Sequence, residues 1–263
     1  LSVIDILTDL YFNRMSYAPK RPTWEDRDRF VLSKGHCVPA QYFCMAKAGY
    51  FPESLLLTLR KLGSPLQGHP DRTAFPGIEA ATGSLGQGLS VACGMALGLK
   101  LGGKTSRVYC VLGDGEVQEG QVWESLMSGP KLGAPDHHLD NLCVILDYNG
   151  VQLDNFVKKI LDLEPVVDKL KAFGWPVIDI NGHDLAQIDK ALDQAEATKG
   201  SPTFIVAHTI KGKGVSFMEN DPEWHAKAPK PTEAVEAIRE IVGEPVPAWA
   251  EPIIAEIQAM EKK

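Results

Sequence analysis

Two stretches of the chain, VYCVLGDG at residues 108–115 and LCVILDYNGV at residues 142–151, decide its fold. Each begins as a continuous apolar run of the length of one β-strand, which is typical of strands covered on both faces of a parallel sheet. Each run then gives way to polar and glycine residues, Gly113-Asp114-Gly115 in the first and Asp147 to Val151 in the second. Because ligands bind outside the carboxyl ends of strands in open parallel sheets, both ends are candidate ligand positions.

The sequence on either side of these strands continues an alternation of strands and helices. Apolar residues at Val3, Ile6, Leu7 and Leu10 share one helical face and predict a helix over residues 1–12. We expect further strands at residues 30–32, 176–180 and 203–208. We expect further helices at residues 40–49, 53–62, 85–101, 119–128, 166–173, 185–198, 233–242 and 253–262. This order predicts an α/β fold, a parallel sheet with helices on both faces. Residues 1–243 are interpreted as one domain, and residues 244–263 as a C-terminal helical tail.

Composition excludes several classes of partner. The 263 residues carry a net charge of −7 with no Lys/Arg block, which argues against a nucleic-acid partner. No apolar run approaches the roughly 20 residues that cross a bilayer, so we expect no membrane partner. The amphipathic start is no signal peptide, and the lack of an initiator Met suggests further residues upstream of Leu1. The cysteines show no C-x-x-C spacing and are interpreted as reduced thiols of a cytoplasmic protein: Cys37, Cys44, Cys93, Cys110 and Cys143.

The polar residues after the two strands suit a divalent metal beside a phosphate. Asp114 offers a carboxylate, Asn149 a side-chain carbonyl and Val151 a main-chain carbonyl, all oxygen ligands of the kind that Mg²⁺ or Ca²⁺ prefers. Gly113 and Gly115 would let the backbone approach a phosphate, and the next helix would offer its N-terminal amides. Gly113-Asp114-Gly115 alone, or Asn149-Gly150 alone, is also typical of a tight turn. Their occurrence at two adjacent strand ends favours a metal–diphosphate site.

A third glycine-rich segment, Thr82 to Gly88, precedes a helix rich in small residues. It resembles a phosphate cradle. It is not a Walker loop, because no Gly-Lys-Ser/Thr follows, and it lacks the G-x-G-x-x-G order of a dinucleotide site.

The sequence resembles the N-terminal half of transketolase, which binds the pyrophosphate of thiamine diphosphate, including the form in which that enzyme is split over two polypeptides. The motifs that carry the resemblance follow the family's order along nearly the whole chain: Ser33-Lys34-Gly35-His36, Gly68-His69-Pro70, Thr82 to Gly88, Gly113 to Gly120, Asp147 to Val151, Gly182-His183-Asp184 and Trp224-His225.

The resemblance implies a pyrophosphate-type domain that binds thiamine diphosphate with Mg²⁺ or Ca²⁺. It implies that Asp114, Asn149 and the Val151 carbonyl hold the metal. The cofactor-binding set that it implies is His36, Gly83, Ser84, Leu85, Gly113, Asp114, Gly115, Glu116, Asn149 and His225.

The resemblance also implies roles in the reaction. His36, His69 and His225 would line the channel and exchange protons with the ketose, since such steps near neutral pH lie within reach of imidazole. Glu119 would belong to an acidic link between the two sites of a dimer. His137, His138 and His208 are interpreted as ordinary surface or core residues, and His183 is left open between a site role and a turn.

The activity that the resemblance implies is transfer of a two-carbon ketol unit between sugar phosphates, as in the pentose phosphate pathway. The family's second half carries the glutamate that activates the cofactor, and these 263 residues do not contain it. We therefore expect the chain to act only with a C-terminal partner subunit, two chains of each kind forming the complex.

The sequence departs from the family's pattern at two further places. The upstream His-Pro-Gly segment, which contributes a histidine, is not among these residues. The spacer between Gly115 and Asn149 is longer than usual, and Gly129 to Pro135 predict a surface loop there.

Three alternatives remain open. Gly-Asp-Gly is shared by 1-deoxyxylulose-5-phosphate synthases and by the α chains of 2-oxo acid dehydrogenases. Glu116 to Gly120 and Trp224-His225 favour transketolase over both. A non-catalytic paralogue is the third alternative, although such a protein has no physical need for this ligand set.

Overall fold

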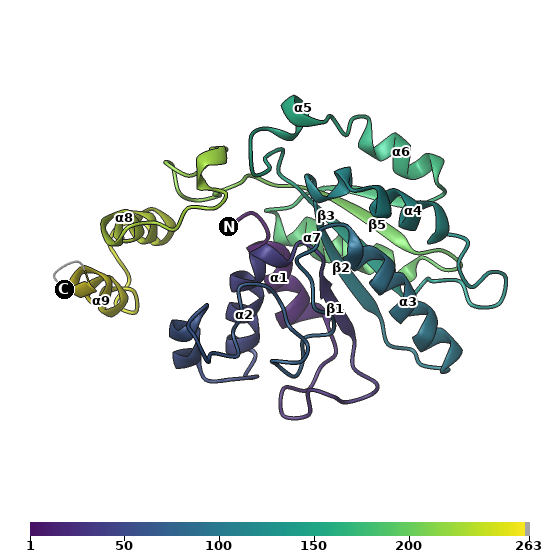
Figure 1. The fold of residues 1–263 in the computed structure, drawn as a ribbon, viewed down its shortest axis with the longest axis horizontal. Coiled ribbons are helices and arrows are strands. Elements are labelled where there is room, and N and C mark those ends of the chain that lie inside the picture. The colour runs from purple at the N-terminus through teal and green to yellow at the C-terminus, as the bar shows by residue number, and fades with distance from the viewer. Residues whose placement is uncertain (261–263) are drawn as a thin grey trace.

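The structure, a computed structural model that describes residues 1–260, is built around a five-stranded parallel sheet (Figure 1). The strand order is β1-β2-β3-β5-β4, and every neighbouring pair is parallel. The strands are β1 Arg29–Leu32, β2 Val108–Gly113, β3 Leu142–Tyr148, β4 Val177–Asn181 and β5 Thr203–His208. The predicted α/β fold with a parallel sheet is therefore confirmed.

Successive strand residues point to opposite faces, and helices cover both faces of the sheet. In β2, Tyr109 and Val111 enter one core cluster, whereas Val108, Cys110 and Leu112 enter the other. The first cluster lies under α1 Ile4–Asp9, α2 Val38–Lys47 and α7 Leu185–Ala197. The second lies under α3 Gln87–Leu101, α4 Gly120–Ser128 and α6 Val166–Ala172.

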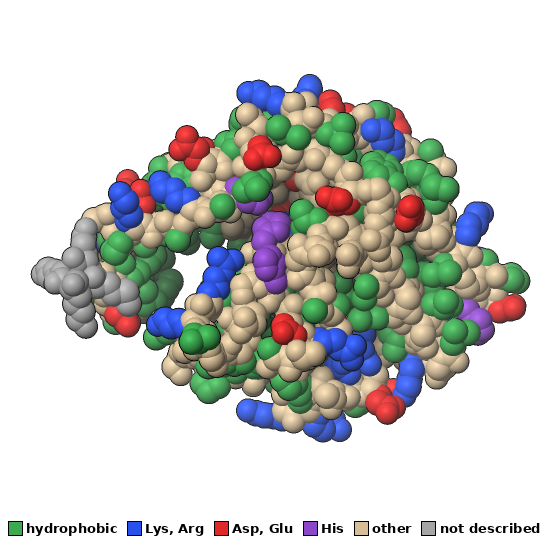
Figure 2. Space-filling view, viewed as in Figure 1, with side chains coloured by type: hydrophobic (Ala, Val, Ile, Leu, Met, Phe, Trp, Pro, Cys, Tyr) green, Lys and Arg blue, Asp and Glu red, His purple; other side chains and the backbone are tan. Residues whose placement is uncertain are grey.

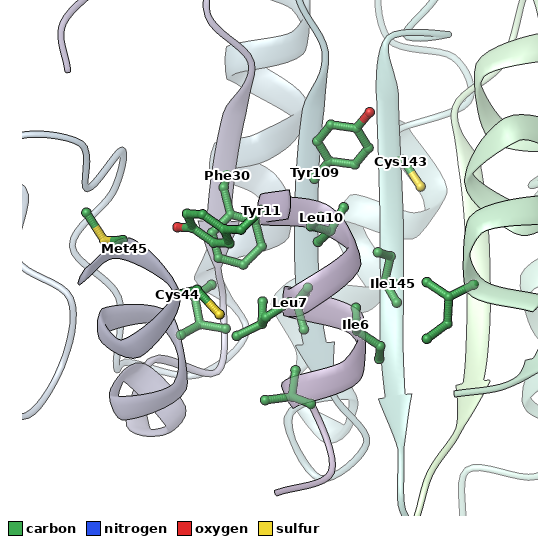
Figure 3. Close-up of a cluster of buried hydrophobic side chains, with 14 of the residues drawn as sticks. Ile6, Leu7, Leu10, Tyr11, Phe30, Cys44, Met45, Tyr109, Cys143 and Ile145 are labelled. Atoms are coloured by element: carbon green, nitrogen blue, oxygen red, sulfur yellow. The ribbon is translucent and has the colours of Figure 1, made fainter. Parts of the chain in front are cut away.

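The N-terminal helix packs as its apolar spacing predicts. Val3, Ile6, Leu7 and Leu10 are all buried, and Figure 3 shows the last three against strand residues of the first cluster. After Asp9 the chain continues as a π-helical turn, Leu10–Arg14.

The predicted helix over residues 53–62 is wrong in its second half. The structure has only a 3-10 segment, Glu53–Thr58, with no fully buried residue. Leu59 leaves the helical conformation, with a ψ of 128°, and Arg60 adopts a φ of 60°, so the helix cannot continue past them. Leu55 and Leu56 are only partly buried and Leu57 is exposed, and without a deep core contact the local sequence does not sustain an α-helix.

The small-residue helix over residues 85–101 forms, as α3, but among its glycines only Gly88, near its start, lies closely against other backbone. A Cβ at Gly88 would lie 2.7 Å from the Ser33 Cα, so this residue must be glycine. Gly94 and Gly98 instead face open space within the described chain.

The last two helices, α8 Pro231–Val242 and α9 Glu251–Met260, pack against each other to one side of the sheet (Figure 1). The segment after β5 joins them to it and contains a 3-10 turn, Pro222–Trp224. Residues 261 and 262 of the predicted last helix lie outside the described residues. The boundary between residues 243 and 244 stays a prediction.

Two features complete the fold. A short helix, α5 Val157–Ile160, lies in the segment after β3 where none was expected. The expected loop at residues 129–135 is present as a series of turns between α4 and β3.

The cysteines are free thiols. Cys44, Cys93, Cys110 and Cys143 are buried, and Cys37 is half-buried. Within residues 1–260, no helix combines the length and the apolar character needed to cross a bilayer.

Candidate functional site

The polar residues singled out from the sequence follow neighbouring strands at one edge of the sheet. Gly113 at the end of β2 is paired with Asp147 near the end of β3, and Tyr148 is paired with His208 of β5. The chain leaving β1 enters this edge through Ser33 and Lys34. On the face drawn in Figure 2, histidine side chains gather beside a hollow between the sheet and the C-terminal helices.

A buried ion pair lies at the centre of this edge. The Lys34 ammonium donates to the carboxylate of Asp147, which also accepts hydrogen bonds from the hydroxyls of Ser2 and Thr209. Burial alone would raise the pKa of Asp147, but the Lys34 charge and these donors lower it below its ordinary value. Burial opposes the charged form of Lys34 as well, and Asp147 nevertheless raises the Lys34 pKa. Both groups are therefore charged near neutral pH, and the pair joins β1, β3 and the segment after β5.

Asp114 is a buried carboxylate held by two backbone amides. It is 2% exposed, and it accepts hydrogen bonds from the N–H of Gly115, at 2.8 Å, and from that of Gly150. Burial raises the pKa of Asp114 to about 6, and the nearby negative charge of Asp147 adds to the rise. A carboxylate in this situation gains from a cation beside it, because the cation offsets the cost of burying its charge.

The loop after β3 brings the other expected metal ligands next to Asp114. The hydrogen bond from Gly150 to Asp114 joins this loop to the loop after β2. The side-chain oxygen of Asn149 accepts the N–H of Val151 at 3.1 Å and keeps a second lone pair. Val151 is buried and forms an isolated antiparallel bridge with Phe156, which fixes the course of the loop.

Glu116 is turned into the protein. Its carboxylate accepts the hydroxyl of Ser33, the N–H of Gly86 at 3.0 Å and the N–H of Gly113 at 3.1 Å. These bonds tie together the residue after β1, the glycine-rich segment Thr82 to Gly88 (the glycine loop) and the end of β2. The sequence grouped Glu116 with the cofactor-binding residues, and in the structure its carboxylate supports the loops around the site. A role in contacting a cofactor stays a prediction.

Two glycines of the glycine loop make room for the catalytic candidates His69, at the site, and Glu119, at its rim. Gly83 has a φ of 140°, and a Cβ there would lie 2.8 Å from the His69 ring, so glycine lets this histidine lie directly on the loop. Gly86 has a φ of 85°, and a Cβ there would lie 2.6 Å from that of Glu119. Glu119 is exposed at the start of α4. Ser84 and Leu85 are exposed between these two glycines.

His36 and His225 meet although 188 residues of the sequence lie between them. Their ring centroids are 5.1 Å apart. Burial lowers the pKa of His36 to about 3, helped by the charge of Lys34. Burial lowers the pKa of His225 to about 4, helped by Lys211 and Lys34. Both imidazoles are therefore neutral near pH 7, where each ring can accept one hydrogen bond and donate another.

Lys211 orients the His225 ring. Its ammonium lies 2.8 Å from the Nδ1 of His225. An ammonium only donates, so Nδ1 accepts and the ring proton is on Nε2. Burial and the nearby charge of Lys34 lower the pKa of Lys211.

The motif Gly182-His183-Asp184 makes structural contacts with α7, with α1 and with the segment after β5. A Cβ at Gly182 would lie 2.5 Å from a methyl carbon of Thr209, and Asp184 caps α7 through the N–H groups of two residues in its first turn. The Nε2 of His183 accepts the N–H of Ile210, so its Nδ1 donates to Asp5 on α1, at 2.7 Å. His183 therefore fastens the segment after β5 to α1.

Two of the other three histidines lie away from this edge. His137 and His138 precede β3 and so lie toward its opposite end. His208 closes β5 and pairs at the surface with Asp179, at 2.7 Å.

The residues present fit a metal bound together with a diphosphate. Among residues 1–260, no three His, Cys, Asp or Glu side chains lie close enough to hold a metal by themselves. A metal at Asp114 would therefore draw its other ligands from amide, carbonyl, water or phosphate oxygens, as Mg²⁺ commonly does. Lys34 and Lys211 place positive charge near Asp114, as a diphosphate would require.

The sequence motifs contained Lys34 and Asp147 but did not indicate that they pair, and sequence reasoning missed Thr209 and Lys211 as members of this edge. The first two carried a signal: Asp147 directly follows an apolar run, and Lys34 comes two residues after one. Thr209 and Lys211 lie just past β5, and no local pattern marked them.

The chain is similar to known transketolases over most of its length. The family model described as the thiamine diphosphate binding domain of transketolase matches residues 1–260. The 6-deoxy-6-sulfo-D-fructose transketolase subunit of Clostridium sp. (strain MSTE9) is 46% identical over 83% of this chain and 78% of that protein. One subunit of the apulose-4-phosphate transketolase of Phocaeicola vulgatus is 40% identical over 92% of this chain and 84% of that protein.

The chain is also similar to a solved transketolase structure. Transketolase from Leishmania mexicana matches with a TM-score of 0.83 and 32% identity, over 98% of this chain. The chain spans only 41% of the length of that enzyme.

Proposed function

The chain belongs to the transketolase family, and from this membership we propose that it is the N-terminal subunit of a thiamine-diphosphate-dependent transketolase. It would transfer a two-carbon ketol unit between sugar phosphates, and only together with a subunit that supplies the C-terminal part of the enzyme. Both relatives described above are similar over most of their own length and are named as transketolase subunits, which supports the split arrangement. A complex with two chains of each kind and a cytoplasmic location stay predictions.

One observation carries the proposal. Asp114, a buried carboxylate with no cation paired to it among the described residues, is hydrogen-bonded to the loop that carries Asn149 and Val151. Metal ligands at two adjacent strand ends, beside basic side chains, suit a metal–diphosphate group. We propose that Mg²⁺ or Ca²⁺ binds to Asp114, Asn149 and the Val151 carbonyl and anchors the cofactor there.

Thiamine diphosphate, when bound, supplies the electron sink for breaking and making carbon–carbon bonds. Lys211 would offer positive charge to the diphosphate, and the Lys34–Asp147 pair would keep the surrounding loops in place. The neutral rings of His36 and His225 would give and take protons at the sugar's oxygen atoms, with His69 on the glycine loop beside them. Glu119, at the rim, would serve the link between the two sites of a dimer.

The sugar is a separate question. The two relatives are named for a sulfofructose and for apulose 4-phosphate, so membership in the family does not fix the donor. We propose a phosphorylated ketose as donor and a phosphorylated aldose as acceptor.

The test is reconstitution. The chain is mixed with a C-terminal transketolase subunit, thiamine diphosphate and Mg²⁺, and transfer from xylulose 5-phosphate to ribose 5-phosphate is followed by mass spectrometry. A panel of other ketose phosphates is run in parallel. We expect activity from the mixture, none from either chain alone, and none from a mixture that contains Asp114→Asn. Full activity of the isolated chain would refute the requirement for a partner. If the reconstituted complex processes a 2-oxo acid and no ketose phosphate, another branch of thiamine diphosphate enzymes is the correct assignment.

A further inference from the structure

We propose that Gln152 is an additional positioning residue of the metal site, whose side-chain oxygen accepts a hydrogen bond from a water molecule bound to the metal. The inference rests on the proposed function, because it takes the metal to bind at Asp114, Asn149 and Val151.

The first observation is an acceptor without a donor. The Oε1 of Gln152 is buried, and none of the described residues donates a hydrogen bond to it. A buried polar oxygen in this position costs free energy unless a donor reaches it. Other side-chain atoms in the described chain are also buried and unpaired, but Gln152 directly follows Val151, an expected metal ligand.

The second observation is where this side chain lies. Gln152 packs against Gly115, the residue after Asp114: a Cβ at Gly115 would lie 2.8 Å from the Gln152 Cβ and 2.9 Å from its Oε1. The φ of Gly115 is −60°, which any residue adopts. Glycine is therefore required at position 115 to make room for the glutamine, and the backbone conformation does not require it.

These contacts place the carboxamide between the two loops of the metal site. Gln152 follows Val151 in the loop after β3, and its side chain reaches the loop after β2 at Gly115. Its main-chain N–H donates to the carbonyl of Asn155 at 2.9 Å, which holds the residue in place.

Ligand chemistry identifies the missing donor. Phosphate oxygens are acceptors and cannot satisfy a carboxamide oxygen. A six-coordinate Mg²⁺ that takes three protein ligands and diphosphate oxygens would keep about one or two waters. The cation polarises these waters, which makes them strong donors. A hydrogen bond from one of them to Gln152 would fix the orientation of the hydrated metal.

The test separates metal binding from folding. Gln152→Leu keeps the packing on Gly115 and removes the oxygen, and Gln152→Glu keeps an acceptor. Gln194→Leu, on the exposed side of α7, is the matched control. For the full chain, Mn²⁺ affinity is measured by electron paramagnetic resonance in the presence of inorganic pyrophosphate. Water-proton relaxation reports on the waters bound to the metal, and urea unfolding is measured without metal.

We expect Gln152→Leu to weaken Mn²⁺ binding about tenfold, in the range that the loss of an outer-sphere partner causes. Its unfolding midpoint without metal should be equal to or above that of the wild type, because an unpaired buried oxygen has been removed. Gln152→Glu should bind Mn²⁺ within about threefold of the wild type, and its water relaxation should change less than that of the leucine variant.

Two results would overturn the inference while leaving the proposed function intact. One is wild-type Mn²⁺ affinity in Gln152→Leu. The other is an equal loss in Gln152→Glu and Gln152→Leu, which would mean that the amide N–H groups act on the diphosphate. If the wild-type chain itself binds neither Mn²⁺ nor pyrophosphate, the proposed metal–diphosphate site fails as well.

Discussion

Replacing Asp114 by Asn should make the folded chain more stable while removing its metal binding. Asp114 is 2% exposed, and among the described residues no cation contacts its carboxylate, because the charges of Lys34 and Lys211 are more distant. In the absence of metal, the folded chain therefore holds a negative charge at a cost. A neutral amide of nearly the same shape avoids that cost.

The size of the effect follows from the pKa. A rise from 3.8 to about 6 corresponds to about 3 kcal/mol of unfavourable free energy for the charged form. Asn accepts one of the two backbone hydrogen bonds that Asp114 accepts, and losing the other costs about 1 kcal/mol. At pH 8 and without metal, Asp114→Asn should thus raise the free energy of unfolding by about 2 kcal/mol.

The pH dependence gives the sharper check. Between the unfolded and folded pKa values, from 3.8 to about 6, the folded chain binds the Asp114 proton more tightly than the unfolded chain does. This group therefore lowers the stability of the wild type as the pH rises through that window and adds no further change above it. The advantage of the asparagine variant should be complete at pH 7–8 and absent near pH 4.

The difference in the free energy of unfolding between the variant and the wild type is measured by urea unfolding at pH 4, 5.5 and 8, with a chelator present to remove metal. Asp154→Asn, at an exposed position in the loop after β3, is the control. The control should stay within about 0.5 kcal/mol of the wild type at each pH. The same samples titrated with Mn²⁺ and pyrophosphate should show binding by the wild type and none by Asp114→Asn. The reasoning is refuted if the variant is less stable at pH 8, or if its advantage is the same at all three values.

Three further outcomes follow from the same contacts. Lys34→Met should lower the free energy of unfolding by about 3–5 kcal/mol, seen in urea, because it leaves Asp147 charged and buried; a loss below 1 kcal/mol contradicts this. Gly83→Ala should lower the free energy of unfolding by about 1–3 kcal/mol and shift the NMR signals of the His69 ring, because alanine is strained at this φ and its Cβ meets that ring. Unchanged His69 signals would contradict the contact. His183→Ala should lower the free energy of unfolding by about 1–3 kcal/mol and speed amide hydrogen exchange in the segment after β5. If the exchange in that segment is unchanged, His183 does not fasten it to α1.

The sequence located the elements well where a local pattern encodes them. Both apolar runs that open the strands β2 and β3, and the glycine and polar residues that end them, are contiguous signals that need no knowledge of the rest of the chain. The helix at residues 53–62 failed for the opposite reason. Its leucines suit a helix, but a short helix depends on burial that only the packed protein supplies, and none of these side chains is fully buried.

The site shows the same division. The motifs identified Asp114, Asn149, His36 and His225, whose roles stay predictions, and the sheet brings all four to one edge. The direction in which a side chain points was not encoded locally. Glu116 lies in the same motif as Asp114, yet it turns inward to three donors from three segments.

By itself, the sequence determined the fold class, the approximate position of each strand end and the family, because these depend on short contiguous patterns. Only the tertiary structure decided that Lys34 neutralises Asp147, that Lys211 orients His225 and that Gln152 fills the space beside Gly115. Each of these contacts joins residues from separate strands or loops, and its strength depends on burial and on neighbouring charge, neither of which a linear pattern contains.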